Sequence, residues 1–301
     1  MNALTLNNIT KTFNDFTAVD MLSLDVPEGS IYGFIGPNGS GKTTTIRMIM
    51  NILHPDTGDI QILGSPRASI DNDLVGYLPE ERGLYKKMKI RELLQFYGQL
   101  KTGHSVLTDV DFWLDKLDLT EWASKKVEAL SKGMSQKVQF IATVVSHPKL
   151  VILDEPFSGL DPVNTDVLLQ AMLELQKNGS TVIFSTHDMA TAEKVCDYVF
   201  MIHKGKKVLD GTLHEIQDKY GSDTLRIRCE NKTSGLDRIA GVDKVHDFGQ
   251  SQELRISPGS DPQDILKKLM EDNTVLSFEL MKPSLHDIFV RIAGAEEVDH
   301  V

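Results

Sequence analysis

The 301-residue chain has little cysteine, no long apolar run and fewer basic than acidic side chains. Its two cysteines, Cys196 and Cys229, have neither the spacing of metal ligands nor an evident histidine partner, so we expect both to stay reduced in a cytosolic protein. No apolar run approaches the roughly 18 residues that cross a bilayer, and the N-terminus lacks the basic flank and apolar core of a secretory signal. We expect any membrane-spanning part to be supplied by another chain.

The charge balance also argues against one class of partner. With 43 acidic and 32 basic side chains, the formal net charge is −11, which repels the phosphate backbone of nucleic acids. The composition is otherwise that of a soluble globular protein, with 41% hydrophobic residues and neither an internal repeat nor a low-complexity tract. We therefore expect no nucleic acid partner, and one large domain or one large and one small domain.

The most informative segment is GPNGSGKTT at residues 36–44, which has the form of a phosphate-binding loop. An apolar run at 30–35 predicts a buried strand before it, and apolar residues at helical spacing over 44–53 predict a helix after it. The glycines let backbone N–H groups turn toward phosphates, Lys42 would reach the outer phosphates, and the Thr43 hydroxyl would ligate a metal ion. The segment predicts binding of a nucleoside triphosphate with magnesium through Gly36, Pro37, Asn38, Gly39, Ser40, Gly41, Lys42, Thr43 and Thr44.

The surrounding pattern predicts an α/β core. Short alternating runs at 4–6 and 22–26 predict antiparallel strands, and residues 88–147 are mostly of helical pattern. The continuous apolar runs at 150–153 and 181–185, with a helical pattern at 166–177 between them, indicate parallel strands joined by a crossover helix.

Two acidic residues, Asp154 and Glu155, follow the predicted strand 150–153. Adjacent acids at a strand end are often only a solvated turn, but ligands approach parallel sheets at this end and a phosphate loop lies upstream. Metal holding and water activation are separate tasks that need separate carboxylates. We therefore expect Asp154 to hold magnesium through its water shell and Glu155 to polarise the water that attacks the γ-phosphate.

The pattern changes near residue 220, where we place a domain boundary. Residues 223–294 predict a small α+β domain in which strands and helices alternate with polar, glycine-containing turns. The predicted strands are 224–228, 244–245, 253–256 and 275–280, and the predicted helices are 262–271 and 285–292. The tail from residue 296 to 301 is expected to be loose.

Five motifs occur in an order that resembles the ATP-binding subunits of ABC transporters, over residues 2–220. Besides the phosphate loop and LVILDEP at 150–156, they are LSKGMSQK at 130–137, SGLD at 158–161 and STHD at 185–188. The resemblance implies a P-loop NTPase cassette with a mixed-sheet core, an antiparallel β subdomain and a helical subdomain. It also implies an ATPase that requires ATP and Mg²⁺ and is coupled to transport.

The resemblance assigns catalytic roles to Lys42, Glu155 and His187. His187 matches the family's switch histidine, which contacts the γ-phosphate and helps to orient the attacking water, although a lone histidine after a strand is otherwise structural. It also places Phe13 where an aromatic ring stacks on adenine, with Val19 as an apolar contact beside it. Core packing is the alternative for Phe13, and Phe16 is a competitor for stacking.

Further implied residues act on a second copy of the chain. Ser131 and Gly133, in the segment that resembles the family signature, would bind the ATP of the neighbouring cassette in a head-to-tail dimer, and Asp161 would lie in the loop that links the two sites. The alternatives are a helix cap at 131 and an N-cap at Asp161 beside Pro162.

The chain departs from the family pattern at three positions. Glu80 stands where a glutamine usually touches magnesium; glutamate still offers an oxygen to the metal but adds a negative charge near the γ-phosphate, tolerable with magnesium or Arg82 nearby. Lys132 replaces a glycine and Met134 a glutamine of the signature. We keep Glu80 as a metal ligand and expect the signature role to survive.

The predicted function is ATP hydrolysis that powers export through separate integral membrane permease subunits, with the chain on the inner face of the cell membrane. Residues 83–88 would receive a helix of the permease. The C-terminal domain resembles that of export ATPases of the sodium-efflux type, through its α+β pattern and the ending PSLHDIFVRIAG. The alternatives are a soluble cassette ATPase acting on ribosomes or nucleic acid and a nucleotide-sensing scaffold without turnover.

Overall fold

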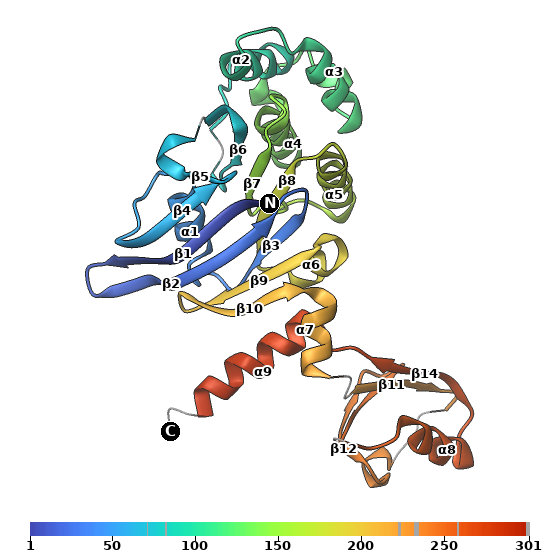
Figure 1. The fold of residues 1–301 in the computed structure, drawn as a ribbon. Helices are drawn as coiled ribbons and strands as arrows, with labels where there is room; N and C mark the ends of the chain where they lie inside the picture. Colours follow the sequence, from blue (N-terminus) through green and yellow to red (C-terminus); the bar gives the residue numbers. More distant parts are fainter. Residues whose placement is uncertain (71, 82, 222–223, 232–234, 258, 299–301) are drawn as a thin grey trace. The chain divides into compact units, whose positions relative to one another are not determined.

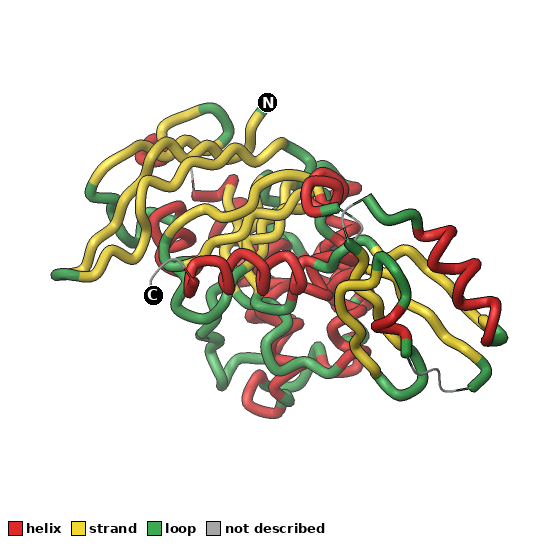
Figure 2. Tube along the Cα trace, turned by 90° about the horizontal axis from the view of Figure 1, so that it is seen from below, coloured by secondary structure: helices red, strands yellow, loops and turns green. Residues whose placement is uncertain are grey.

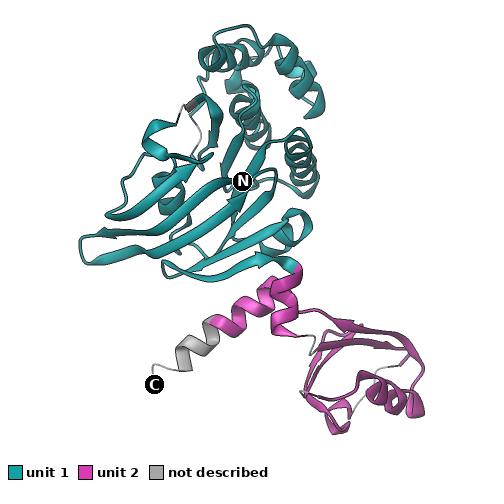
Figure 3. Ribbon diagram, in the orientation of Figure 1, with its two compact units in different colours: residues 1–213 teal, residues 214–301 magenta. Residues whose placement is uncertain are grey.

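The chain divides into two compact units, residues 1–213 and 214–301 (Figure 3). The computed structural model describes residues 1–70, 72–81, 83–221, 224–231, 235–257 and 259–298. The first domain was predicted to extend to residue 220, whereas residues 214–220, which form most of the helix α7 (Leu213–Tyr220), belong to the second compact unit. Residue 223, where the second domain was predicted to begin, lies outside the described residues.

A mixed sheet forms the centre of the first unit. Its strand order over the described residues is β10-β9-β3-β8-β7-β6, in which β9 and β10 are antiparallel and the other neighbours are parallel. Every residue of β3, β7 and β8 is buried, as their unbroken apolar runs predict for strands covered on both faces. The bounds are β3 (Ile31–Ile35), β6 (Val75–Leu78), β7 (Leu150–Asp154), β8 (Thr181–Thr186), β9 (Tyr198–His203) and β10 (Lys206–Thr212).

A second, antiparallel sheet has the order β2-β1-β4-β5. Its two long strands run side by side from the N-terminus (Figures 1 and 2), and their inward residues join the core that α1 and the central sheet share. The predicted antiparallel strands are confirmed and are longer than the runs that indicated them. The bounds are β1 (Asn2–Phe13), β2 (Phe16–Pro27), β4 (Thr57–Ile62) and β5 (Ser65–Pro66).

Helices complete the first unit, with α2 and α3 beside α4 at the end of the unit that carries β6 and β7 (Figure 1). Their bounds are α1 (Lys42–Ile49), α2 (Ile90–Thr102), α3 (Leu107–Lys116), α4 (Lys132–Val144), α5 (Pro162–Lys177) and α6 (Met189–Val195). Short 3₁₀ helices span Arg67–Ser69, Asn72–Leu74, Thr120–Trp122 and Val127–Ala129. The fold is the predicted cassette: mixed core, antiparallel β subdomain and helical subdomain.

Two helix boundaries differ from the prediction for local reasons. The helix α1 ends at Ile49, before the expected residue 53, because Arg67 Nε binds the carbonyl oxygen of Ile49 at 2.6 Å and Asn51 is left-handed, with φ of 59°. The helix α5 begins at Pro162, before the expected residue 166, because the Asp161 side chain accepts the Asn164 N–H at 2.9 Å.

The second unit is the predicted α+β domain, with the sheet order β12-β13-β11-β14. Apolar side chains of β11, β13 and α8 form its core, including Leu225, Leu254 and Leu269. The helix α9 continues to Val298 and so covers part of the tail that was expected to be loose; residues 299–301 lie outside the described residues. The bounds are β11 (Thr224–Cys229), Leu236–Arg238 (3₁₀), β12 (Val242–Asp247), β13 (Gln252–Ile256), α8 (Pro262–Asp272), β14 (Val275–Met281) and α9 (Leu285–Val298).

Among the helices that the structure describes, none combines the length and the apolar character that crossing a bilayer requires.

Candidate functional site

The loop between β3 and α1 is shaped by its glycines. Gly39 and Gly41 have φ of 77° and 111°, which side chains with a Cβ disfavour, and a Cβ on Gly41 would lie 2.6 Å from the Ala18 carbonyl oxygen. The Ser40 carbonyl oxygen accepts a hydrogen bond from the Gly205 N–H at 2.9 Å, which ties the loop to the β9–β10 turn. The loop therefore has the close backbone packing that a phosphate cradle requires.

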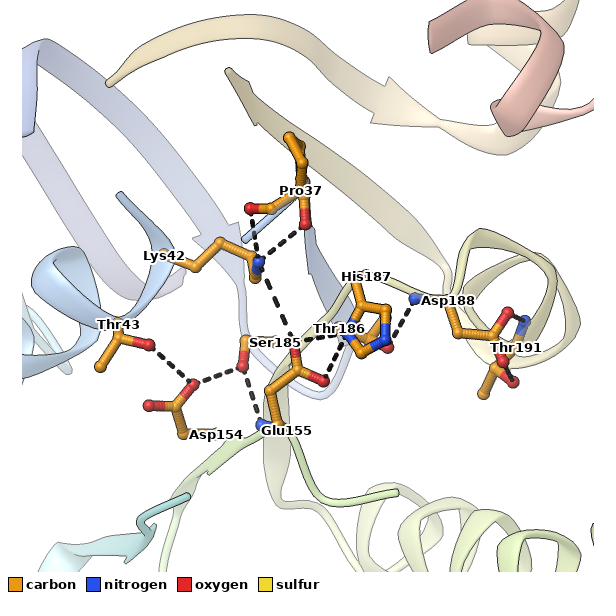
Figure 4. Close-up of polar contacts among 11 residues, drawn as sticks. Pro37, Lys42, Thr43, Asp154, Glu155, Ser185, Thr186, His187, Asp188 and Thr191 are labelled. Atoms are coloured by element: carbon orange, nitrogen blue, oxygen red, sulfur yellow. Dashed lines mark hydrogen bonds and ion pairs between the residues drawn. The ribbon is translucent and has the colours of Figure 1, made fainter. Parts of the chain in front are cut away.

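Lys42 lies inside this loop with its ammonium group held in place. Its Nζ donates to the carbonyl oxygens of Gly36 at 2.7 Å and Pro37 at 3.1 Å, and lies 3.9 Å from Glu155 Oε1. Burial lowers the pKa of the Lys42 ammonium, while the negative charges of Glu155, Asp154 and Glu80 act in the opposite direction. The nearby carboxylates thus support a buried positive charge beside the phosphate loop (Figure 4).

Asp154 ends β7 with its carboxylate in a polar but incomplete environment. Its Oδ1 accepts the Ser185 hydroxyl at 2.6 Å and the Thr43 hydroxyl at 3.5 Å. Its Oδ2 is buried and has no hydrogen-bond partner in the described part of the chain. A buried, unpartnered carboxylate oxygen beside a hydroxyl is a donor set that suits a hard cation.

Glu155 follows directly and adopts a backbone conformation that is unusual for its residue type. Its φ is 48°, which costs a residue with a Cβ about 1–2 kcal/mol. The Glu155 N–H donates to Ser185 Oγ at 2.9 Å, and both carboxylate oxygens lie 3.1 Å from His187 Nδ1. A strained backbone that surrounding contacts hold in place is typical of functional positions. Glu155 has such a backbone, and its carboxylate lies between Lys42 and His187 (Figure 4).

A cavity of about 500 Å³ brings most of the predicted nucleotide-site residues together. Among the described residues it is lined by 38–44 of the phosphate loop and by Phe13, Phe16, Ala18, Glu80, Glu155, Ser158 and His187. Its volume is within the range of small-ligand sites. Glu80, from the segment after β6, lies at this cavity as its predicted metal role requires, whereas Arg82 falls outside the described residues.

Of the two predicted adenine contacts, Phe13 lines the cavity and Val19 does not. Phe13 is 43% exposed at the cavity, with the Lys11 ammonium 5.7 Å from its ring centroid, so core packing is the wrong alternative for this ring. Phe16 lines the same cavity and is 63% exposed. Val19 is fully buried in the hydrophobic core and does not line the cavity, whereas the preceding residue of β2, Ala18, does.

Gly36, Pro37 and Asp154 are not part of the cavity lining, although Lys42 and Thr43 contact them. The residues predicted to act on a second copy of the chain, Ser131, Gly133 and Asp161, also lie outside the lining. Ser131 caps α4 by accepting the Met134 N–H at 3.2 Å, so the helix-cap alternative is confirmed, as it is for Asp161. Hydrogen bonds from Asn164 lower the pKa of Asp161. The starts of α4 and α5 adjoin, since a Cβ on Gly133 would lie 3.3 Å from Leu160 Cδ2.

Besides Ala18 and Ser158, which line the cavity, the sequence did not indicate a role for Ser185. Ser185 is fully buried in β8 and contacts both Asp154 and Glu155. The available signal was a serine that ends an otherwise apolar run in the strand neighbouring β7.

Comparisons with known proteins agree with this geometry. The model for the family described as "ABC transporter" matches residues 19–158, and the model for the "ATP-binding protein DrrA1-3-like, C-terminal domain" matches residues 211–293. The chain is 41% identical to the uncharacterized ABC transporter ATP-binding protein YhaQ of Bacillus subtilis over 294 residues, covering 97% of this chain and 99% of that protein. It is 31% identical to the Nod factor export ATP-binding protein I of Burkholderia lata, covering 97% of each.

Solved structures give the same result. A structure of an ATP binding subunit of an ABC transporter matches with a TM-score of 0.68 and 31% identity, covering 73% of this chain and 93% of that chain. The structure of cbiO1 from Clostridium perfringens, described as part of the ABC transporter complex cbiONQ, matches with a TM-score of 0.65 and 25% identity, covering 73% and 92%.

Proposed function

The chain belongs to the family of ABC transporter ATP-binding proteins, whose cassettes are ATPases, and on this premise we propose how its own residues bind and hydrolyse ATP. The observation that carries the proposal is the cavity that joins the phosphate loop, Phe13, Glu80, Glu155 and His187. The phosphates would lie against the backbone N–H groups of the loop, with Lys42 on the outer phosphates. The adenine would stack on Phe13.

Thr43, Asp154 and Glu80 would hold Mg²⁺. Among the described residues no group of three or more His, Cys, Asp or Glu side chains forms a metal site, so phosphate oxygens would have to complete the coordination. When bound, Mg²⁺ supplies neutralisation of the charge that develops on the phosphates. Asp154 Oδ2, at the end of β7, and the Thr43 hydroxyl, in the first turn of α1, would be the oxygens that bind the ion or its water shell.

Glu155 would polarise the attacking water, because it lines the cavity and its carboxylate lies close to both Lys42 and His187. His187 Nδ1 at 3.1 Å would keep that carboxylate oriented and leave the imidazole to contact the γ-phosphate. Lys42, 3.9 Å away, would move its ion pairing from Glu155 toward the phosphates when ATP binds.

A substitution at Glu155 tests this mechanism. Glu155→Gln keeps the shape of the side chain and removes its charge, so we expect ATP binding within about threefold of the original protein and hydrolysis reduced by about 100-fold or more. Fluorescent ATP binding and phosphate release measure the two steps. The matched control is Glu174→Gln on α5, a half-buried glutamate that pairs with Lys116 and does not line the cavity, and it should leave both unchanged. Normal turnover in the Glu155 variant would exclude the assigned role.

The position of Ser131, Gly133 and Asp161 outside the cavity lining supports a head-to-tail dimer. These residues lie at the adjoining starts of α4 and α5, where backbone N–H groups can bind phosphate. In such a dimer each chain's Ser131 and Gly133 would contact the ATP held by its partner's phosphate loop. Asp161 would connect the two sites.

We further propose that the dimer drives export through separate membrane permease subunits, from the inner face of the membrane. A hollow of about 470 Å³, lined among others by Leu84, Lys86 and Leu130, supports residues 83–88 as a permease-binding surface. Exposed Tyr85 lies against Phe96 and Tyr97, with ring centroids 6.5 and 6.2 Å away. The relatives named for Nod factor export support the direction.

The test is co-purification with the Glu155→Gln variant from native membranes. A multi-span membrane protein in the recovered complex would support the transporter proposal. Recovery of ribosomes or of soluble proteins alone would support the alternative, a soluble ATPase acting on ribosomes or nucleic acid.

A further inference from the structure

The hydroxyl of Ser185 is shared between the two acidic residues that the mechanism uses. It donates to Asp154 Oδ1 at 2.6 Å and accepts the Glu155 N–H at 2.9 Å. The side chain of Ser185 is completely buried. It lies in β8, which pairs with β7 in the parallel sheet. A serine hydroxyl has one proton to donate, and here the proton goes to Asp154.

This arrangement orients the Asp154 carboxylate. Ser185 and Thr43 both donate to Oδ1, at 2.6 and 3.5 Å, whereas Oδ2 has no hydrogen-bond partner within the described residues. Rotation of the carboxylate about its Cβ–Cγ bond would break the short Ser185 bond. The two oxygens are therefore distinguished, with one committed to the protein and the other left for a cation or its water shell.

The same hydroxyl supports the backbone of Glu155. That residue is left-handed, with φ of 48°, and its N–H has Ser185 Oγ as acceptor. The direction in which the Glu155 side chain leaves the strand depends on this φ, and its carboxylate lies between Lys42 and His187. Loss of the acceptor would free the peptide that joins Asp154 to Glu155 to rotate.

We propose that Ser185 is a positioning residue that sets the Asp154 carboxylate and the Glu155 backbone relative to each other through one hydroxyl. The proposal rests on the proposed function of these two acids. It predicts that the Ser185 hydroxyl affects metal affinity and the hydrolytic step, and leaves the metal-free affinity for nucleotide unchanged.

The test compares Ser185→Thr with Ser185→Val, which share a shape and differ in the hydroxyl, together with Ser185→Ala. The first readout is Mn²⁺ affinity in the presence of a non-hydrolysable ATP analogue, followed by electron paramagnetic resonance. We expect Ser185→Val and Ser185→Ala to weaken Mn²⁺ binding by about 10- to 100-fold and to lower kcat by about the same factor. Ser185→Thr should retain most of the Mn²⁺ affinity and most of kcat. Nucleotide affinity without metal should stay within about twofold.

A purely structural serine would give a different result. Equal Mn²⁺ affinity and equal kcat in the Thr and Val variants, with only the unfolding midpoint changed, would overturn the proposal. Asp154→Asn is the reference variant that distinguishes a failure of the Ser185 proposal from a failure of the proposed function. If Asp154→Asn leaves Mn²⁺ binding unchanged, the metal site itself is wrong; if it abolishes binding while Ser185→Val does not, only the role of Ser185 is wrong.

Discussion

At the residue scale, Glu155 combines a chemical role with an unfavourable backbone. A left-handed φ of 48° suits glycine far better than a residue with a Cβ. The chain therefore carries a local cost at the position where the proposed water-polarising carboxylate is needed, as expected where function and stability oppose each other.

This conflict predicts that Glu155→Gly is more stable than Glu155→Ala by about 1 kcal/mol, although neither should hydrolyse ATP. Both variants lose the carboxylate contacts to Lys42 and His187, so the difference in their stability isolates the backbone. Urea unfolding of the two variants measures it. Equal stabilities, or a more stable alanine variant, would contradict the strain that we infer.

At the scale of elements, the site is assembled where strands end and helices begin. Asp154 ends β7, His187 follows the neighbouring strand β8, and Lys42 opens α1 after β3. Parallel pairing of these strands puts their carboxyl ends at one edge of the sheet, so residues more than 100 positions apart meet there. The helices that follow β7 and β8 begin at side-chain N-caps, Asp161 for α5 and Asp188 for α6.

One such cap predicts a pH dependence. Asp188 caps α6 by accepting the Thr191 N–H at 3.2 Å and its hydroxyl at 2.6 Å. Burial raises the pKa of Asp188, but the hydrogen bonds from Thr191 and the charge of His187 outweigh it and leave the pKa below its usual value. A lowered folded-state pKa means that the ionised cap stabilises the protein above the unfolded pKa, near 4, and that this stabilisation disappears as the pH falls through the folded value.

The check is Asp188→Asn, which can still cap the helix but cannot titrate. We expect it to be less stable than the original protein at pH 7, by up to about 1 kcal/mol, and the difference to shrink only as the pH is lowered below about 4. Denaturant unfolding at several pH values measures it. A difference that grows on acidification would show that the sign is wrong.

At the scale of the whole molecule, every predicted nucleotide contact lies within residues 1–213, and the two units have separate hydrophobic cores. We therefore expect a chain that ends at residue 213 to bind ATP with an affinity within about threefold of the full chain, because no cavity residue is removed. Titration with fluorescent ATP measures this. A loss of more than tenfold in a folded truncated chain would show that the second unit contributes to the site.

The proposed dimer gives a second prediction at this scale. The Glu155→Gln variant should change from monomer to dimer when ATP and Mg²⁺ are added, because ATP would join the loop of one chain to Ser131 of the other. Light scattering after size-exclusion chromatography measures the mass. Lys42→Ala, which loses a phosphate contact, is the control that should stay monomeric. Nucleotide-independent dimers would contradict the head-to-tail arrangement.

The errors of the sequence-based predictions have local physical causes. The helix α1 was predicted too long because apolar spacing continues past Ile49, while the Arg67 side chain that ends it comes from a distant segment. Val19 was predicted as an adenine contact but is buried in the hydrophobic core, and its neighbour Ala18 lines the cavity; the exposure of a strand residue depends on pairing register, which the sequence does not show. Ser185 was missed because its hydrogen bonds join two strands that are distant in the sequence, and such bonds produce no recognisable spacing of residues.

The sequence by itself determined the cassette fold, the phosphate loop, the acid pair and the family, because each follows from a local pattern: glycines at fixed offsets, apolar runs of strand length and motifs in order. Only the tertiary structure decided which oxygen of Asp154 remains unpartnered, that Glu155 is left-handed and that Ser185 serves both residues. Those features depend on the pairing of β7 with β8, and contacts between distant strands are set by packing of the whole core rather than by any one segment.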